Sequence, residues 1–115
     1  MTIDAVESMP GLVVQLQGQT EMTTVVAVAG EVDMENSDEF VREVSKLVPR
    51  DGGHRVVLDL SGVTFLGSAG LLALLQCRTT AEHRGSRLEI SHAHRNVRQV
   101  LTICNLDSLF HLPQA

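Results

Sequence analysis

The order in which strand-like and helix-like segments follow one another constrains the fold of this chain most. Two runs rich in apolar and β-branched residues, 12–17 and 23–29, flank a turn and predict an antiparallel hairpin. From about residue 36 onward, helical and strand-like periodicities alternate, which is typical of parallel strands joined by right-handed crossovers. The sequence therefore predicts an α/β domain, with helices packed against a mixed, mostly parallel β-sheet of four to five strands.

The elements after the hairpin have recognisable start and stop residues. Asn36 or Ser37 is suited to cap a helix that extends to about Val48, where Pro49 follows. Gly85 is a suitable C′ residue for the second helix, which has Ser68 in its first turn. The other expected elements are a strand over 55–60, a turn at 61–62, a strand over 87–90, a helix from about 96 with Cys104 on its apolar face, and a short closing strand within 106–112.

Length and composition exclude several classes of function. A chain of 115 residues is long enough for one hydrophobic core, so we expect a single domain over 1–115. Only 3% of the residues are aromatic, which argues against modules that stack bases or sugars on aromatic rings. The net charge of −5 argues against a nucleic-acid or membrane surface, and the longest apolar run, 71–75, is far shorter than the ~18 residues of a membrane span.

Charge is distributed unevenly along the chain. Residues 1–57 carry a balance of −6, whereas residues 58–115 carry +1. An acidic first half suits a basic surface on a partner, and an ordinary solvated face is the alternative interpretation.

The amino terminus and the cysteines indicate a reducing compartment. Residues 1–4 lack the charged and apolar regions of a signal peptide. Cys77 and Cys104 match neither a zinc-binding nor a C-x-x-C spacing. We therefore expect a cytoplasmic protein with no metal and no cofactor. Two buried, reduced thiols are one interpretation of the cysteines, and a redox-switched disulfide is another.

Residues 67–70, Gly-Ser-Ala-Gly, are the most informative part of the sequence. They stand between an apolar strand and an apolar helix, so Ser68 is expected at the carboxyl end of the sheet. A helix N-terminus offers free N–H donors and partial positive charge, which suit a phosphoryl group on Ser68. Gly67 and Gly70 would let another backbone approach closely. An N-cap role for Ser68 is the alternative interpretation.

A hydrolase site is the catalytic alternative. Ser68, Asp107 and His111 follow one another in Ser-Asp-His order, but the G-x-S-x-G motif of such enzymes needs a glycine where Leu66 stands. We therefore expect no enzymatic activity.

The stretch 57–71, VLDLSGVTFLGSAGL, resembles the central signature of the STAS domain, and more narrowly that of bacterial anti-sigma factor antagonists. A second match, GEVD at 30–33, resembles the G-E-L-D that follows the second strand in that family. The resemblance extends from about 12 to 112 and implies one STAS domain over nearly the whole chain. Two positions differ from the family's signature, since Gly67 stands where Asp is usual and Ala69 where Ser or Thr is usual.

The resemblance implies a switch in bacterial transcription regulation rather than an enzyme. Members of this family bind an anti-sigma factor that is also a serine kinase, and so release a sigma factor. The kinase phosphorylates the antagonist, which ends the complex, and a phosphatase restores binding. Carried over by position, the phosphoacceptor is Ser68, and the partner-binding residues are Asp33, Gly67, Ser68, Ala69 and Gly70.

The resemblance also allows a second role. The alternative is a STAS subunit of a larger signalling or transporter-associated assembly, regulated by the redox state of Cys77 and Cys104 rather than by phosphorylation. For the antagonist itself we expect a monomer or weak dimer that binds neither nucleic acid nor membrane.

Overall fold

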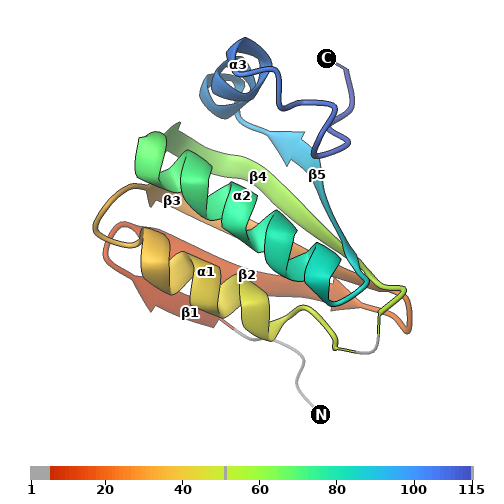
Figure 1. The fold of residues 1–115 in the computed structure, drawn as a ribbon. Helices are drawn as coiled ribbons and strands as arrows, with labels where there is room; N and C mark the ends of the chain where they lie inside the picture. The colour runs from red at the N-terminus through yellow and green to blue at the C-terminus, as the bar shows by residue number, and fades with distance from the viewer. Residues whose placement is uncertain (1–5, 51, 115) are drawn as a thin grey trace.

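In the described part of the chain, five strands form one sheet, and each strand is hydrogen-bonded to its neighbours in sequence order (Figure 1). The structure, a computed structural model, describes residues 6–50 and 52–114. The β1–β2 and β2–β3 pairs are antiparallel, whereas β3–β4 and β4–β5 are parallel, so the predicted α/β class with a mixed sheet is confirmed. The strands are β1 (Val6–Met9), β2 (Leu12–Gln19), β3 (Thr23–Val32), β4 (Arg55–Leu66) and β5 (Arg87–Ala93).

Two of the three helices among the described residues, α1 (Ser37–Lys46) and α2 (Ser68–His83), lie side by side across one face of the sheet (Figure 1). The third, α3 (Arg95–Ile103), lies against β4 and β5 at one end of the domain. Helix α1 has acidic residues in its first turn and turns its apolar stripe, including Phe40 and Val44, toward the sheet. These side chains and the inward-facing residues of β2–β5 make one continuous hydrophobic core.

The hairpin of β2 and β3 agrees with the sequence prediction, but β1 was missed. The chain turns at Pro10-Gly11, where Gly11 has a φ of +75°, and β1 adds to the outer edge of β2. A Pro-Gly pair is a turn signal, but β1 has only four residues, which is too few for a clear strand periodicity.

Strand β4 is twice as long as the sequence predicted. The expected turn at 61–62 is wrong, because β4 continues to Leu66 through an irregularity in its pairing with β3. Asp59 supports that irregularity by accepting hydrogen bonds from the Ser61 amide (3.0 Å) and hydroxyl (2.7 Å). A Cβ on Gly62 would lie 2.9 Å from the Ala29 Cβ, so this glycine serves a close approach of two strands.

The carboxyl-terminal segment also differs from expectation. Among the described residues after α3 there is no strand; they form turns, so the predicted strand within 106–112 is wrong. The segment still covers the edge of β5, because the Ile90 amide donates to the Phe110 carbonyl (2.9 Å) and the Phe110 side chain is buried. Cys104 follows the last residue of α3 and is exposed, so its predicted place on the buried face is wrong.

Candidate functional site

The central strands β3 and β4 are parallel, so their carboxyl ends lie next to each other at the same end of the sheet. Val32 and Leu66 are register partners, and the Gly67 amide donates to the Val32 carbonyl (3.1 Å). The loop after β3 therefore begins, at Asp33, beside the start of α2. The structure thus brings together two segments, 30–33 and 67–70, that are more than thirty residues apart in the sequence.

Ser68 is the first residue of α2 and is exposed. Gly67 holds the N-cap position in an extended conformation, so the alternative interpretation of Ser68 as the N-cap is wrong. Within the described part of the chain, no side chain caps α2 and no acidic residue lies in its first turn. The amides of Ser68, Ala69 and Gly70 lie in that turn, where they have no intrahelical acceptors and carry the positive end of the helix dipole. A phosphoryl group on Ser68 would lie beside these donors.

The two glycines of the signature have different surroundings. Gly70 is buried, and a Cβ there would lie 2.6 Å from the Val32 carbonyl oxygen and 2.8 Å from Leu66 Cδ1. Gly70 therefore lets α2 approach β3, which is a requirement of the fold rather than of a partner. Gly67 is half-buried, and a Cβ there would lie 3.2 Å from the ring of Phe65.

Asn36 holds the loop that carries Asp33. Its side-chain amide donates to the carbonyls of Pro10 (2.7 Å) and Glu31 (2.8 Å), and its Oδ1 accepts from the Asp33 amide (3.0 Å). The side chain is almost fully buried and these bonds replace a capping hydrogen bond, although Asn36 is the N-cap residue of α1. The sequence predicted the position but not this loop-fixing role, which depends on contacts with the distant turn at Pro10.

We expect Asn36→Leu to lower the free energy of unfolding by about 2–3 kcal/mol, because two carbonyls and one amide lose their partner in a buried place. Urea denaturation followed by circular dichroism measures this change. Gln76→Ala, on the exposed side of α2, is the matched control and should change stability by less than about 0.5 kcal/mol. Equal stabilities of the two variants would contradict the assigned role.

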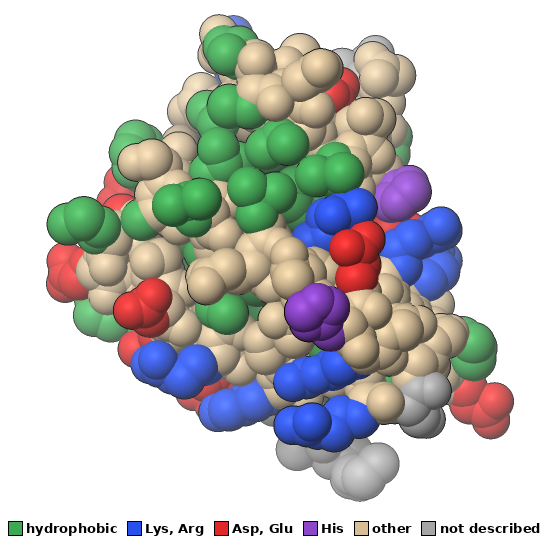
Figure 2. Space-filling model, viewed as in Figure 1, with side chains coloured by type: hydrophobic (Ala, Val, Ile, Leu, Met, Phe, Trp, Pro, Cys, Tyr) green, Lys and Arg blue, Asp and Glu red, His purple; other side chains and the backbone are tan. Residues whose placement is uncertain are grey.

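The segments that meet at Ser68 carry exposed apolar side chains. Met34 is 87% exposed in the loop after β3, Phe65 is 51% exposed near the end of β4, and Leu72 is 63% exposed on α2. Figure 2 shows hydrophobic side chains gathered over the upper part of the helical face, from the start of α2 toward α3, with charged side chains lower down over α1. Exposed apolar side chains on neighbouring segments are typical of surfaces that contact another protein. We call the surface formed by Asp33, Met34, Phe65, Ser68, Ala69 and Leu72 the Ser68 surface.

The first two turns of α2 are apolar on the outer side as well as the inner side, whereas the exposed residues of its second half are polar. Leu74 is fully buried, Leu71 and Leu75 are half-buried, and Leu72 faces outward. A groove of about 620 Å³ runs between α1 and α2, with Ala69, Leu72 and Asp38 among its lining residues. A surface helix normally has a polar outer side, so the apolar outer side of the first two turns of α2 is suited to contact another protein.

The rim of the Ser68 surface is acidic. Glu31 and Glu35 are exposed and Asp33 is half-buried, all at the carboxyl end of β3, and Asp38 is exposed in the first turn of α1. The Asp33 carboxylate accepts from the Glu35 amide (3.0 Å), which fixes its direction. An apolar centre with an acidic rim is complementary to an apolar surface with basic residues around it.

The two cysteines lie in different environments and both are free thiols. Cys77 is buried in α2, and burial raises the pKa of its thiol to about 12. Since the thiolate is the reactive form, Cys77 is chemically inert in the folded protein. Neither the burial of Cys77 nor the exposure of Cys104 favours the redox interpretation.

Comparison with known proteins identifies the family. The family model described as "Mlab, STAS domain" matches residues 15–113. The chain belongs to the STAS domain family. Among its described helices, none combines the length and apolar character that crossing a membrane requires.

Solved structures show where this STAS fold occurs. An anti-sigma factor antagonist from Mycobacterium paratuberculosis is 27% identical, with a TM-score of 0.62 over 97% of this chain and 85% of that one. The unphosphorylated anti-sigma factor antagonist SpoIIAA has a TM-score of 0.70 at 20% identity, over 89% of this chain and 87% of that one. The murine Solute Carrier 26 family member A9 anion transporter has a TM-score of 0.71 at 22% identity, over 83% of this chain but 16% of the transporter.

Proposed function

We propose that this STAS domain is an anti-sigma factor antagonist. It binds an anti-sigma factor of the serine-kinase type through the Ser68 surface and so releases a sigma factor. The observation that carries the proposal is the exposure of Ser68 at the start of α2, with Met34, Phe65 and Leu72 exposed around it. The similarity to the Mycobacterium paratuberculosis antagonist along nearly the whole chain supports the same role.

Phosphorylation of Ser68 is the proposed switch. A phosphoryl group adds about −1.5 to −2 charges to a surface whose rim already carries Glu31, Asp33 and Glu35. The first-turn amides of α2 would stabilise the phosphoserine in the free protein. The partner would then have to desolvate this charge in the middle of an apolar contact, which weakens the complex. A phosphatase that removes the group would restore binding.

We expect Ser68→Glu to weaken binding to the anti-sigma factor of the same cell about tenfold or more, because it places a fixed charge at the centre of the contact. Ser68→Ala should bind within about threefold of the unmodified protein, since it removes only a small exposed hydroxyl. Isothermal titration calorimetry measures both affinities.

The matched control is Ser8→Glu, which adds the same charge to an exposed serine. Ser8 lies on β1, an edge strand of the sheet, whereas α2 packs near β4 and β5, toward the other end of the strand order. It should leave the affinity unchanged. Mass spectrometry after incubation with the anti-sigma factor and ATP should place one phosphoryl group on Ser68. Equal affinities for Ser68→Glu and Ser68→Ala would discard the switch.

A further inference from the structure

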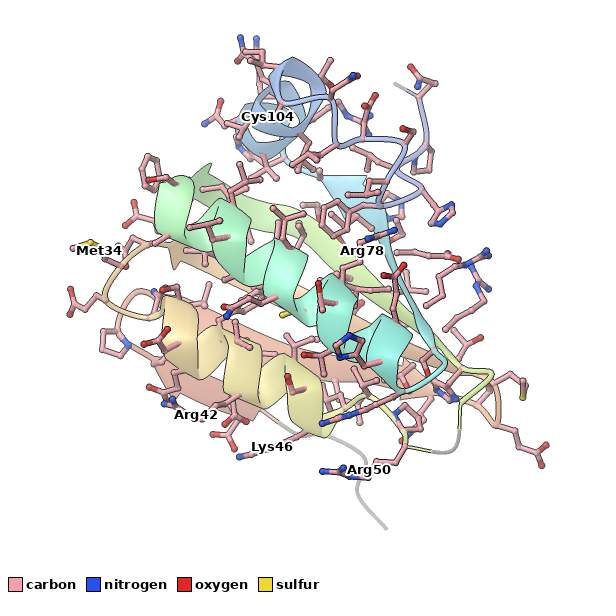
Figure 3. The ribbon with its side chains drawn as sticks, viewed as in Figure 1. Met34, Arg42, Lys46, Arg50, Arg78 and Cys104 are labelled. Carbon is pink, nitrogen blue, oxygen red and sulfur yellow. The ribbon has the colours of Figure 1, made fainter. Side chains whose placement is uncertain are left out.

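A second surface, unrelated to Ser68, lies at the carboxyl end of α1. A groove of about 580 Å³ there contains four of the nine lysines and arginines of the chain, and no acidic side chain lines it among the residues that the structure describes. Figure 3 shows Arg42, Lys46 and Arg50 along one edge of the molecule, and Figure 2 shows basic side chains side by side there. We call it the basic groove; its lining residues are Val41, Arg42, Ser45, Lys46, Val48, Pro49, Arg50 and Arg84.

Not all of these cations are equally available. Arg84 Nη1 donates to the carbonyls of Ser45 (2.6 Å) and Val48 (3.0 Å), so its guanidinium neutralises the negative end of the α1 dipole. Lys46 pairs with Glu43 at 2.9 Å. Within residues 6–50 and 52–114, Arg42 and Arg50 have no ion-pair partner, and both are exposed. The basic groove therefore presents two exposed guanidinium groups above a partly apolar floor.

The loop before α1 carries an exposed apolar side chain and negative charge, and so is complementary to the basic groove. Met34 is 87% exposed at its tip, and Asp33 and Glu35 stand on either side of it. A long apolar side chain flanked by two carboxylates matches an apolar floor flanked by two guanidinium groups. Both halves of this match belong to the same chain, and Figure 3 shows Met34 on a different side of the molecule from Arg50.

We propose that copies of this chain associate head to tail, with the Met34 loop of one copy in the basic groove of the next. Arg42 and Arg50 would pair with Asp33 and Glu35 across the contact, and Met34 would cover the apolar floor. Because the Met34 loop and the basic groove lie on different sides of the molecule, we expect two copies to make one such contact and not both at once. The contact is then heterologous and does not close at a dimer. Association occupies the Met34 loop and so competes with the anti-sigma factor; this last consequence alone rests on the proposed function.

Sedimentation velocity from about 10 µM to about 1 mM protein tests the proposal, since this range covers weak association. The weight-average mass should increase with concentration without levelling off at twice the monomer mass. Raising the salt concentration from about 0.05 M to about 0.5 M should reverse the association, because the contact depends on exposed ion pairs.

Two variants test the Met34 loop and the basic groove one at a time. A head variant, Met34→Ser with Glu35→Lys, keeps the basic groove, and a tail variant, Arg42→Glu with Arg50→Glu, keeps the Met34 loop. Each alone should associate at least about tenfold more weakly than the unmodified chain. An equimolar mixture should form a dimer and nothing larger, because only one functional contact can form. Arg95→Glu, on the exposed side of α3, is the charge control and should associate normally.

Three outcomes would overturn the proposal: a monomer throughout the concentration range, a mass that levels off at the dimer, or a mixture of the two variants that stays monomeric. Circular dichroism of each variant checks that it is folded. Because the experiment measures the mass of the isolated chain, its result tests self-association whether or not an anti-sigma factor binds.

Discussion

Replacing Gly30 by alanine should lower the free energy of unfolding by about 3 kcal/mol or more, the largest stability change that we expect from a single methyl group. Gly30 has a φ of +118°, which L-residues rarely adopt. A Cβ there would lie 2.1 Å from the Gly11 carbonyl oxygen and 3.0 Å from its carbonyl carbon. Both atoms belong to the backbone, so no side-chain rotation relieves the overlap, and β2 and β3 would have to separate.

The control is Gly18→Ala in the same pair of strands. A Cβ on Gly18 would have no heavy atom of the described residues within 4 Å, apart from its immediate chain neighbours, and the φ of Gly18 is not positive. Its substitution should change stability by less than about 1 kcal/mol. Urea denaturation of both variants compares them directly. Similar losses at the two positions would show that the close contact of Gly30 with Gly11 is not what requires glycine.

Leu72→Asp should weaken the complex with the anti-sigma factor about 100-fold, while leaving the free energy of unfolding within about 0.5 kcal/mol of its original value. Leu72 is 63% exposed, so the folded chain gains little from it. In the complex, the side chain lies at the centre of the proposed contact, beside Ala69 in the groove between α1 and α2. The new carboxylate also adds to the acidic rim and would be desolvated on binding.

Calorimetric titration of Leu72→Asp against the partner measures this loss. Val6→Asp is the matched control, because Val6 is an apolar residue of similar exposure (52%) on β1, at the opposite edge of the sheet. It should bind with unchanged affinity. Unchanged binding by Leu72→Asp, or an equal loss in both variants, would contradict the assignment of the Ser68 surface.

The sequence predicted the elements whose signals are local. The run of β-branched residues in β3, the apolar stripe of α1 and the glycine that ends α2 lie where they were expected, and Gly85 has a φ of +73°. Elements that depend on distant partners were missed or misjudged. Ser61-Gly62 has the composition of a turn, but Gly62 pairs with Ala29 and β4 continues.

The candidate site shows the same division. The signature around Ser68 predicted a serine in the first turn of α2 and a neighbouring acidic loop, and the structure has both at the carboxyl ends of β3 and β4. The exposure of Met34, Phe65 and Leu72 could not be predicted, because apolar residues in such patterns are usually assigned to the core. Which of the leucines in α2 faces outward depends on how α2 packs on the sheet, and Gly70 allows its close approach to Val32 at the end of β3.

Hydrogen exchange of the chain, with and without the anti-sigma factor of the same cell, tests the central claim most directly. The account predicts slower amide exchange on binding in residues 33–37 and 65–76, with no change in β1 and β2, and loss of this protection once Ser68 is phosphorylated. Protection confined to β1 and β2, or protection around Ser68 that persists after phosphorylation, would contradict it.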